Sequence, residues 1–165
     1  MTTVTFKGTP VHLAGTFLNL KQKAPSFTLV GSGLEDITLE SLPAVKKLLL
    51  IVPSLETSVC ATCTRTFHAK VANRKDLLLL VISADLPFAQ KRYCDTEKFS
   101  NLTTLSTMRD QSFAKDYGVL IQEGPLKGLC ARAVLLLDET NNVIYEELVS
   151  EITSEPNYDK VFSCI

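Results

Sequence analysis

The chain has 165 residues, of which 45% are hydrophobic, and its mean hydropathy is +0.15. These values predict a globular protein with a core large enough to fold alone, and they exclude a disordered chain. Lys and Arg number 17 against 18 Asp and Glu, a formal net charge of −1. We therefore expect no surface built to bind nucleic acid or anionic lipid.

The N-terminal part of the sequence predicts two β-hairpins. The first has strands at Val4–Phe6 and Val11–Leu13, and the second has strands at Phe27–Val30 and Asp36–Leu39. Glycine-containing segments separate the two strands of each pair, as is typical of hairpin turns.

A βαβ unit is predicted next. Lys47–Val52 and Leu77–Ser83 are continuous apolar runs, typical of strands buried on both faces, and a helix is expected between them from about Val59 to Ala72. Two strands joined by a crossover helix run parallel in the same sheet.

Three shorter elements follow. Asp85 is expected to cap a helix over Pro87–Cys94, with the proline in its first turn. Thr103–Leu105 predicts a strand, and Asp110–Tyr117 predicts a helix that Gly118 ends.

The C-terminal part predicts a third hairpin, with strands at Cys130–Leu137 and Val143–Leu148, and a final helix at Pro156–Ser163. No repeat or composition break marks a second domain, so we expect residues 1–165 to form one domain. A parallel βαβ unit followed by an antiparallel hairpin and a helix is the thioredoxin-like order: an α/β fold with a central mixed sheet flanked by helices. Fold alone does not give function.

No segment has the pattern of a secretory signal or a membrane span, and we expect a cytoplasmic protein. The number of cysteines is odd and their density is low, which does not fit a disulfide-stapled secreted scaffold. They are more readily explained as catalytic, metal-binding or inert core residues. The cysteines are Cys60, Cys63, Cys94, Cys130 and Cys164.

Cys60 falls in the first turn of a predicted helix if Thr57 or Ser58 is the N-cap. The free backbone N–H groups and the helix dipole favour a thiolate there, and the thiolate is the nucleophilic form of cysteine. The Thr57 hydroxyl can face the same anion. The alternative is that Cys60 is a small hydrophobic core residue, as free cysteines often are.

Arg132 interrupts the apolar run Leu129–Leu137. A buried arginine is costly unless its charge meets an anion, and the predicted strand contains no acidic residue. A thiolate at Cys60, or a substrate oxyanion beside it, would supply the negative partner. The alternative places Arg132 at a strand edge, where it reaches solvent or a distant carboxylate. Strand alternation puts four residues on one face: Cys130, Arg132, Val134 and Leu136.

The pattern Pro53-x-x-x-Thr57-x-x-Cys60, together with Arg132, resembles the active-site signature of the peroxiredoxins. Further segments are similar to the bacterial thiol peroxidase subfamily of atypical 2-Cys peroxiredoxins, and the likeness covers essentially the whole chain. These segments are Ser83–Gln90, Leu105–Thr107, Tyr117–Val119, Gly124–Gly128, Val143–Tyr145 and Glu151–Tyr158.

The resemblance implies a role for each residue of the signature. Cys60 would be the peroxidatic cysteine, Thr57 would position the peroxide, and Pro53 would shield the sulfur. Arg132 would stabilise the thiolate and the leaving oxygen. Cys94 would be the resolving cysteine, which condenses with the Cys60 sulfenic acid to an intramolecular disulfide.

The resemblance also implies hydrogen peroxide and alkyl hydroperoxides as substrates, thioredoxin as reductant, and a homodimer. No cofactor and no metal are implied. Because a disulfide needs Cα atoms within roughly 4.4–6.8 Å, we expect the segments around Cys60 and Cys94 to unwind locally during turnover.

Two features depart from the family pattern. Asp95-Thr96-Glu97 follows Cys94, where a small, glycine-containing segment is more usual. Cys63 completes a formal C-x-x-C with Cys60, but the Trp and the Gly-Pro of the thioredoxin motif are missing. Because Cys63 shares an apolar helix stripe with Phe67 and Val71, we interpret it as buried and inert, with a redox role as the alternative.

The remaining candidates are weaker. A zinc site of Cys60, Cys63 and His68 would lack a fourth ligand, since His12 is far away in sequence. Cys130 is assigned to core packing, and Cys164 is expected to be exposed.

Three functions compete on this sequence: a peroxidase using Cys60 and Cys94, a thiol–disulfide oxidoreductase using the C-x-x-C pair, and a catalytically silent thioredoxin-like interaction module.

Overall fold

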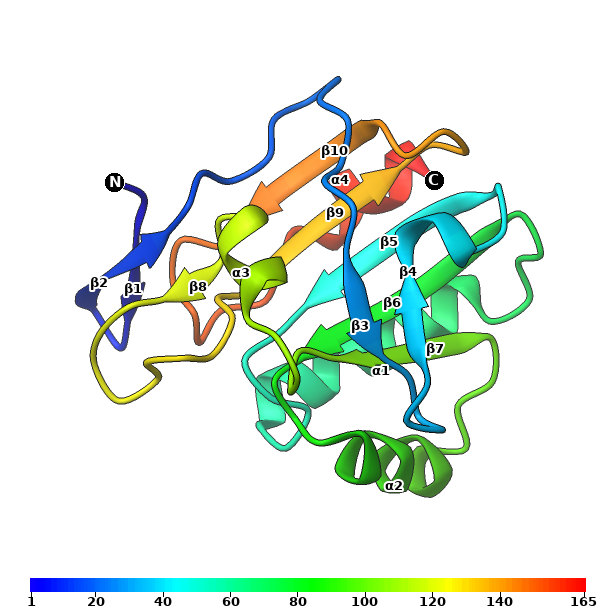
Figure 1. Ribbon diagram of the computed structural model, residues 1–165, viewed down its shortest axis with the longest axis horizontal. Helices are drawn as coiled ribbons and strands as arrows, with labels where there is room; N and C mark the ends of the chain where they lie inside the picture. The colour runs from blue at the N-terminus through cyan, green and yellow to red at the C-terminus, as the bar shows by residue number, and fades with distance from the viewer.

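The computed structural model describes residues 1–165, and none of its helices combines the length and apolar character needed to cross a membrane. Figure 1 shows a large twisted sheet with helices on both sides, and a small sheet beside it that contains the first two strands. The elements are β1 (Thr3–Phe6), β2 (Thr9–Ala14), β3 (Thr28–Val30), β4 (Asp36–Thr38), a 3-10 turn (Leu39–Ser41), β5 (Lys46–Ile51), α1 (Ser58–Val71), β6 (Leu77–Ser83), α2 (Pro87–Glu97), β7 (Leu102–Ser106), α3 (Ser112–Asp116), β8 (Leu120–Ile121), β9 (Ala133–Leu137), β10 (Val143–Leu148) and α4 (Tyr158–Cys164).

The large sheet has the strand order β10-β9-β5-β6-β7-β3-β4. The central strands β5, β6 and β7 are parallel, and α1 connects the first two, which confirms the predicted βαβ unit. Strand β9 pairs antiparallel with β5, and β10 pairs antiparallel with β9. This mixed sheet flanked by helices is the predicted thioredoxin-like α/β arrangement.

Strands β5 and β6 are largely apolar because both of their faces are covered. Along β5, Leu49 and Ile51 belong to a cluster of 25 buried residues on one face, whereas Leu48 and Leu50 belong to a cluster of 15 on the other. Helices α1 and α4 cover the smaller cluster, and α1 contributes Cys60, Cys63, Phe67 and Val71 to it. The run that predicted a doubly buried strand therefore packs against two separate cores.

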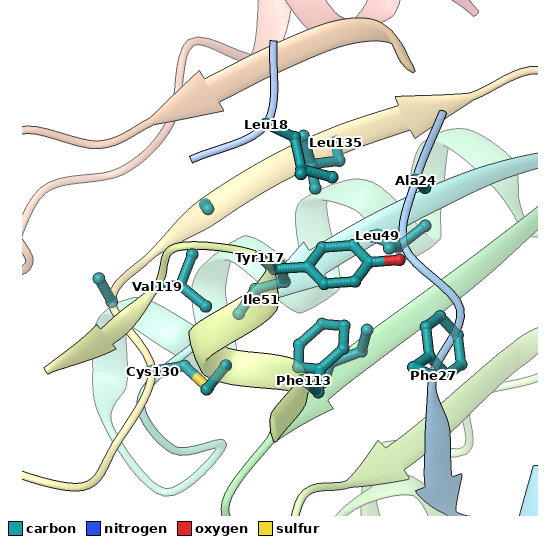
Figure 2. Close-up of a cluster of buried hydrophobic side chains, with 14 of the residues drawn as sticks. Leu18, Ala24, Phe27, Leu49, Ile51, Phe113, Tyr117, Val119, Cys130 and Leu135 are labelled. Atoms are coloured by element: carbon teal, nitrogen blue, oxygen red, sulfur yellow. The ribbon is translucent and has the colours of Figure 1, made fainter. Parts of the chain in front are cut away.

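Aromatic side chains pack in the larger cluster, among them Phe113 of α3 and Tyr117 directly after it, as Figure 2 shows. The rings of Phe113 and Tyr117 stack with centroids 4.3 Å apart, and Phe27 meets Phe113 edge-on at 5.6 Å. The buried Tyr117 hydroxyl donates a hydrogen bond to the carbonyl of Pro25 at 2.8 Å. The short α3 is thus fixed by its packing rather than by its length.

The two N-terminal hairpins are confirmed. Strands β1 and β2 pair antiparallel, and so do β3 and β4. The first hairpin lies outside the large sheet, where β2 pairs with β8 in a three-stranded sheet.

The prediction that Asp85 caps α2 is wrong. The N-cap of α2 is Leu86, which makes no side-chain capping bond, and the helix continues three residues past Cys94, to Glu97. The Asp85 carboxylate is already used elsewhere: it accepts from the Ser54 hydroxyl at 2.6 Å and from the Leu55 amide at 2.7 Å. It therefore ties the loop before α1 to the end of β6.

The predicted strand Cys130–Leu137 begins later than expected, at Ala133. The residues before it pair with the small sheet instead: Cys130 bridges Leu120, and the Ala131 amide donates to the Val119 carbonyl at 2.8 Å. The chain crosses from the small sheet to the large one at the next residue. Arg132 occupies that crossing rather than the interior of a strand.

The last two predicted helices are also shifted. Helix α3 excludes Asp110, whose carboxylate accepts from the Ser112 amide at 2.8 Å, and its end is followed by Gly118 as expected. Helix α4 begins at Tyr158 because the side chain of Asn157 caps it by accepting from the Lys160 amide.

Gly118 and Gly8 provide a matched test of backbone crowding, because both have positive φ angles, of 68° and 80°. A Cβ at Gly118 would lie 2.2 Å from the Phe17 nitrogen, whereas a Cβ at Gly8 would meet nothing within 4 Å. We expect Gly118→Ala to lower the free energy of unfolding by about 2–5 kcal/mol, and Gly8→Ala by about 1 kcal/mol. Urea unfolding measures both, and equal losses would contradict the predicted clash.

Candidate active site

Cys60 lies in the first turn of α1, at the position the sequence predicts. Thr57 is the N-cap, and its hydroxyl oxygen accepts a hydrogen bond from the Cys60 amide at 3.3 Å. The same hydroxyl donates to the Ser54 carbonyl at 3.4 Å. The Cys60 side chain is 0% exposed, so its sulfur sits beneath the loop that begins α1.

Arg132 places its guanidinium directly against the Cys60 sulfur. Its Nη1 and Nη2 atoms are each 3.4 Å from the Cys60 Sγ, and its Nε and Nη2 donate to the Ile152 carbonyl at 3.2 and 3.0 Å. The side chain is 1% exposed and forms no salt bridge with a carboxylate. The alternative of an edge position with a solvent or carboxylate partner is therefore wrong.

This arrangement favours a negative charge on sulfur. A buried guanidinium without an anion is strongly disfavoured, and here the side-chain groups that accept its hydrogen bonds are sulfur atoms. Hydrogen bonds from a cation to an anionic acceptor are about twice as strong as neutral ones. The Cys60 thiolate is the form of this side chain that satisfies Arg132.

A pocket of about 240 Å³ opens beside this pair. Its polar lining includes Thr57 and Arg132, and Pro53 lies in its wall, so three of the predicted site residues meet there. Most of the remaining wall is apolar. The other lining residues are Phe6, Ser54, Ser58, Val59, Leu126, Leu129, Ile152 and Thr153.

Several of these pocket residues escaped the sequence analysis. Phe6 comes from the N-terminal hairpin, Leu126 and Leu129 come from the loop after β8, and Ile152 comes from the loop before α4. Phe6 ends strand β1, whereas the other three lie in irregular segments where no periodicity singles them out. The available signal for this wall is the family resemblance of Gly124–Gly128, which contains Leu126, and of Glu151–Tyr158, which contains Ile152.

Cys63 is closer to the site than a purely structural interpretation requires. Its side chain is 0% exposed and belongs to the same apolar cluster as Phe67 and Val71, as the helix stripe predicts. Its sulfur also lies 3.8 Å from Nη1 of Arg132. Burial raises the pKa of the Cys63 thiol, while the Tyr158 hydroxyl and the arginine oppose this shift.

Cys94 lies on α2 and is half-buried, and all five cysteines are free thiols. Burial, and next the neighbouring Asp95 carboxylate, raise the pKa of the Cys94 thiol to about 11. Its sulfur makes no hydrogen bond to Cys60 or Arg132, and the residue lines a separate hollow with Leu42. The structure therefore does not bring Cys94 to the Cys60–Arg132 pair.

Two ion pairs hold the Cys94 helix to the Cys60 region. On α2, Arg92 pairs with Glu56 at 2.5 Å, and Glu97 pairs with Arg65 of α1 through two bonds of 2.7 and 2.8 Å. Glu97 belongs to the charged segment that departs from the family pattern. These contacts fix α2 against α1 in the reduced form.

Cys130 packs in the core as expected, in the larger cluster with Phe113, as Figure 2 shows. The prediction that it shares a strand face with Arg132 is wrong, because the residues before Ala133 are not in the large sheet. Full burial raises the pKa of the Cys130 thiol to about 12. Cys164 is half-buried against the smaller cluster rather than exposed.

The histidines serve other contacts. The His12 ring pairs with Glu123, and the His68 Nε2 lies 2.6 Å from the Ser100 carbonyl oxygen. No group of three or more His, Cys, Asp or Glu side chains is arranged to hold a metal ion.

Comparison with known proteins identifies relatives of this chain. Residues 19–162 match the Redoxin family model. The chain is 49% identical over 160 residues to the thiol peroxidase of Leptospira interrogans, with 96% of this chain and 94% of that protein covered. A peroxiredoxin-like protein from Aquifex aeolicus superposes with a TM-score of 0.91 at 42% identity, covering 98% of this chain and 94% of that one.

A thiol peroxidase from Chromobacterium violaceum superposes with a TM-score of 0.92 at 29% identity, covering 98% of this chain and 93% of that one. The family match spans most of the chain, and the Leptospira relative is well above the identity at which family membership is secure. The chain therefore belongs to the redoxin family and, within it, to the thiol peroxidase branch of the peroxiredoxins.

Proposed function

We propose that this thiol-dependent peroxidase reduces hydrogen peroxide and alkyl hydroperoxides with the sulfur of Cys60. The observation that carries the proposal is the buried Arg132, whose two Nη atoms lie 3.4 Å from the Cys60 Sγ with no carboxylate paired to it. Such a fixed cation stabilises the attacking thiolate and the negative oxygen that forms as the peroxide bond breaks. The mostly apolar pocket beside it suits an organic hydroperoxide as well as hydrogen peroxide.

In the first step the Cys60 thiolate attacks the terminal oxygen of the peroxide. An S–O bond forms and the O–O bond breaks, so sulfur is oxidised by two electrons to a sulfenic acid and the peroxide is reduced. The leaving alkoxide, or hydroxide from hydrogen peroxide, accepts a hydrogen bond from Arg132 and takes a proton from solvent water to become an alcohol or water. Thr57 orients the peroxide, and Pro53 limits access of water to the sulfur.

In the second step the Cys94 thiolate attacks the sulfenic sulfur and displaces hydroxide, which leaves a Cys60–Cys94 disulfide. Cys60 has no exposed surface and Cys94 lies within α2, so both helix segments unwind before the sulfurs meet. The ion pairs of Glu56 with Arg92 and of Arg65 with Glu97 oppose that unwinding. Thioredoxin then reduces the disulfide by thiol exchange.

We also propose that residues 1–165 act as one domain, that two copies form a homodimer, and that the enzyme works in the cytoplasm, where thioredoxin keeps its thiols reduced. The family resemblance supports these three statements. Sedimentation of the reduced and the oxidised protein measures the assembly.

The second candidate is a thiol–disulfide oxidoreductase that uses Cys60 and Cys63. The observation in its favour is that Arg132 contacts both sulfurs, at 3.4 and 3.8 Å. Cys63 also lies one helical turn from Cys60, a spacing at which side chains meet. This enzyme would reduce protein disulfides without Cys94.

The role of Arg132 is tested by Arg132→Lys, which retains the charge but loses the fork that reaches the sulfur and the Ile152 carbonyl together. We expect kcat/KM for peroxide to fall about 100-fold or more, measured by peroxide consumption with dithiothreitol as reductant. The matched control is Arg109→Lys, because Arg109 pairs with Asp36 at the surface. A Lys variant within threefold of wild type, with unchanged thermal unfolding, would contradict the assigned role.

The choice of resolving cysteine is tested by adding one equivalent of peroxide and mapping the peptides without reduction. We expect a Cys60–Cys94 bond. We also expect Cys94→Ser to stop after one turnover with thioredoxin as reductant, because the chain then lacks the thiol that converts the Cys60 sulfenic acid into the disulfide that thioredoxin reduces. Cys63→Ser is the control and should turn over normally. A dominant Cys60–Cys63 bond, with full turnover in Cys94→Ser, would instead establish the second candidate.

The pH dependence of the second step tests the unwinding. The folded α2 raises the pKa of Cys94 to about 11, whereas an unwound segment restores a value near 8.5. Above pH 9 the thiolate fraction, and with it the condensation rate, therefore levels off if α2 is unwound and continues to rise if α2 is folded. We expect the condensation rate to rise about tenfold per pH unit below pH 8 and to level off near pH 9. Since the chain has no Trp, the rate is followed by rapid acid quench and mass spectrometry. A rate still rising at pH 10 would mean that α2 stays folded.

A further inference from the structure

The N-terminal hairpin reaches the active site at two points. Phe6 of β1 lines the pocket beside Cys60 and Arg132. Thr5, its neighbour, bonds through its backbone to the segment after β10: the Thr5 amide donates to the Ser150 carbonyl at 2.7 Å, and the Ile152 amide donates to the Thr5 carbonyl at 2.8 Å. The small sheet is therefore coupled to the site through its first strand (Figure 1).

The Ile152 carbonyl is the link between this segment and the reacting sulfur. It accepts two hydrogen bonds from Arg132, from Nε at 3.2 Å and from Nη2 at 3.0 Å. The guanidinium is planar and rigid, so the position of this carbonyl sets the direction in which the Nη atoms point. The same two Nη atoms hold the Cys60 sulfur.

Glu151 lies between Ser150 and Ile152, the two residues that the Thr5 backbone binds. Its carboxylate accepts hydrogen bonds both from the hairpin and from its own loop. From the hairpin it accepts the Thr5 hydroxyl at 2.7 Å and the amides of Lys7 and Gly8, each at 3.0 Å. From its own loop it accepts the Thr153 amide at 3.1 Å and hydroxyl at 2.7 Å. All five contacts are donors, so both carboxylate oxygens are needed as acceptors.

We propose that Glu151 is a positioning residue for peroxide reduction: it ties the hairpin to residues 150–153, fixes the Ile152 carbonyl, and thereby holds Arg132 against Cys60. This role rests on the proposed function of Cys60 and Arg132, and it adds a residue that touches neither the sulfur nor the pocket. Small displacements of a catalytic group cost large factors in rate, which makes such a support consequential.

Glu151 remains ionised throughout the range in which a peroxidase is assayed. The hydroxyls of Thr5 and Thr153 and the surrounding amides hold the pKa of its carboxyl far below the usual range. Its support of the site is therefore constant above pH 5. A pH profile in that range reports on Cys60 and the groups that face it, which are Arg132, Cys63 and Tyr93.

The test is Glu151→Gln, which has the same size but turns an amide NH2 toward donors that need an acceptor. We expect kcat/KM for hydrogen peroxide to fall about tenfold or more. We also expect the midpoint of the pH dependence of Cys60 alkylation by iodoacetamide to move upward by about half a unit or more, because a displaced Arg132 stabilises the thiolate less. The rate of Cys60–Cys94 condensation in a single turnover should stay unchanged.

Glu123→Gln is the matched control. Glu123, in the loop after β8, accepts the His12 amide at 3.0 Å and contacts the His12 ring, so it binds the other strand of the same hairpin and makes no contact with residues 150–153. We expect neither its kcat/KM nor its alkylation midpoint to change. Thr5→Val removes one donor to Glu151 and retains the backbone bonds, so it should shift both quantities in the same direction by less.

The outcomes separate the possible failures. A lowered melting temperature in Glu151→Gln, with kcat/KM and the alkylation midpoint unchanged, would overturn the positioning role and leave a structural one. If Glu151→Gln does not fold, Thr5→Val decides the matter, because unchanged values in that folded variant likewise refute the proposal. Absence of peroxide consumption by wild type would instead remove the proposed function itself.

Discussion

The active site depends on one buried contact, between the guanidinium of Arg132 and the sulfur of Cys60. A charged group at 1% exposure is costly, and this one has no carboxylate partner. The unfavourable burial becomes favourable when the sulfur is a thiolate, because the two charges then satisfy each other in a site that excludes water. In the proposed mechanism the same cation also stabilises the oxygen that leaves when the peroxide bond breaks, so a single contact would serve both the reactant and the transition state.

The fold explains why the arginine sits where it does. The chain passes from the small sheet to the large one at Arg132, between the Ala131 amide bonded to Val119 and strand β9, which begins at Ala133. At that crossing the side chain emerges toward the cluster that holds Cys60, while Cys130 packs into the opposite cluster. The small sheet therefore contributes to the site in two ways. Phe6 of β1 lines the pocket, and Thr5 of β1 donates to Glu151, the residue before the Ile152 carbonyl that accepts from Arg132.

The three cysteines nearest this chemistry have different environments. Cys60 has a cation and a helix start, Cys63 has the edge of the same cation but lies deeper in an apolar cluster, and Cys94 has neither. Burial within the folded α2 raises the pKa of the Cys94 thiol to about 11, which disfavours its thiolate at neutral pH. In the proposed mechanism, disulfide formation therefore requires α2 to open, and this opening must break the Arg65–Glu97 pair to α1 and the Arg92–Glu56 pair to the loop before α1.

The sequence by itself determined the order and type of most elements, since apolar runs such as Lys47–Val52 and glycine-containing turns are local signals, but it missed the two-residue strand β8. It also determined Cys60 with its N-cap Thr57, because helix capping acts within a few residues, and it marked Arg132 as a buried charge in need of an anion. Only the tertiary structure decided that Arg132 contacts the Cys60 sulfur, that Cys130 faces the opposite core, and that Asp85 serves the loop before α1 rather than the helix after it. The apolar part of the pocket wall and the contact of Glu151 with Thr5 were equally beyond the sequence, because they join segments more than 100 residues apart, and no local pattern encodes which distant loops a fold brings together.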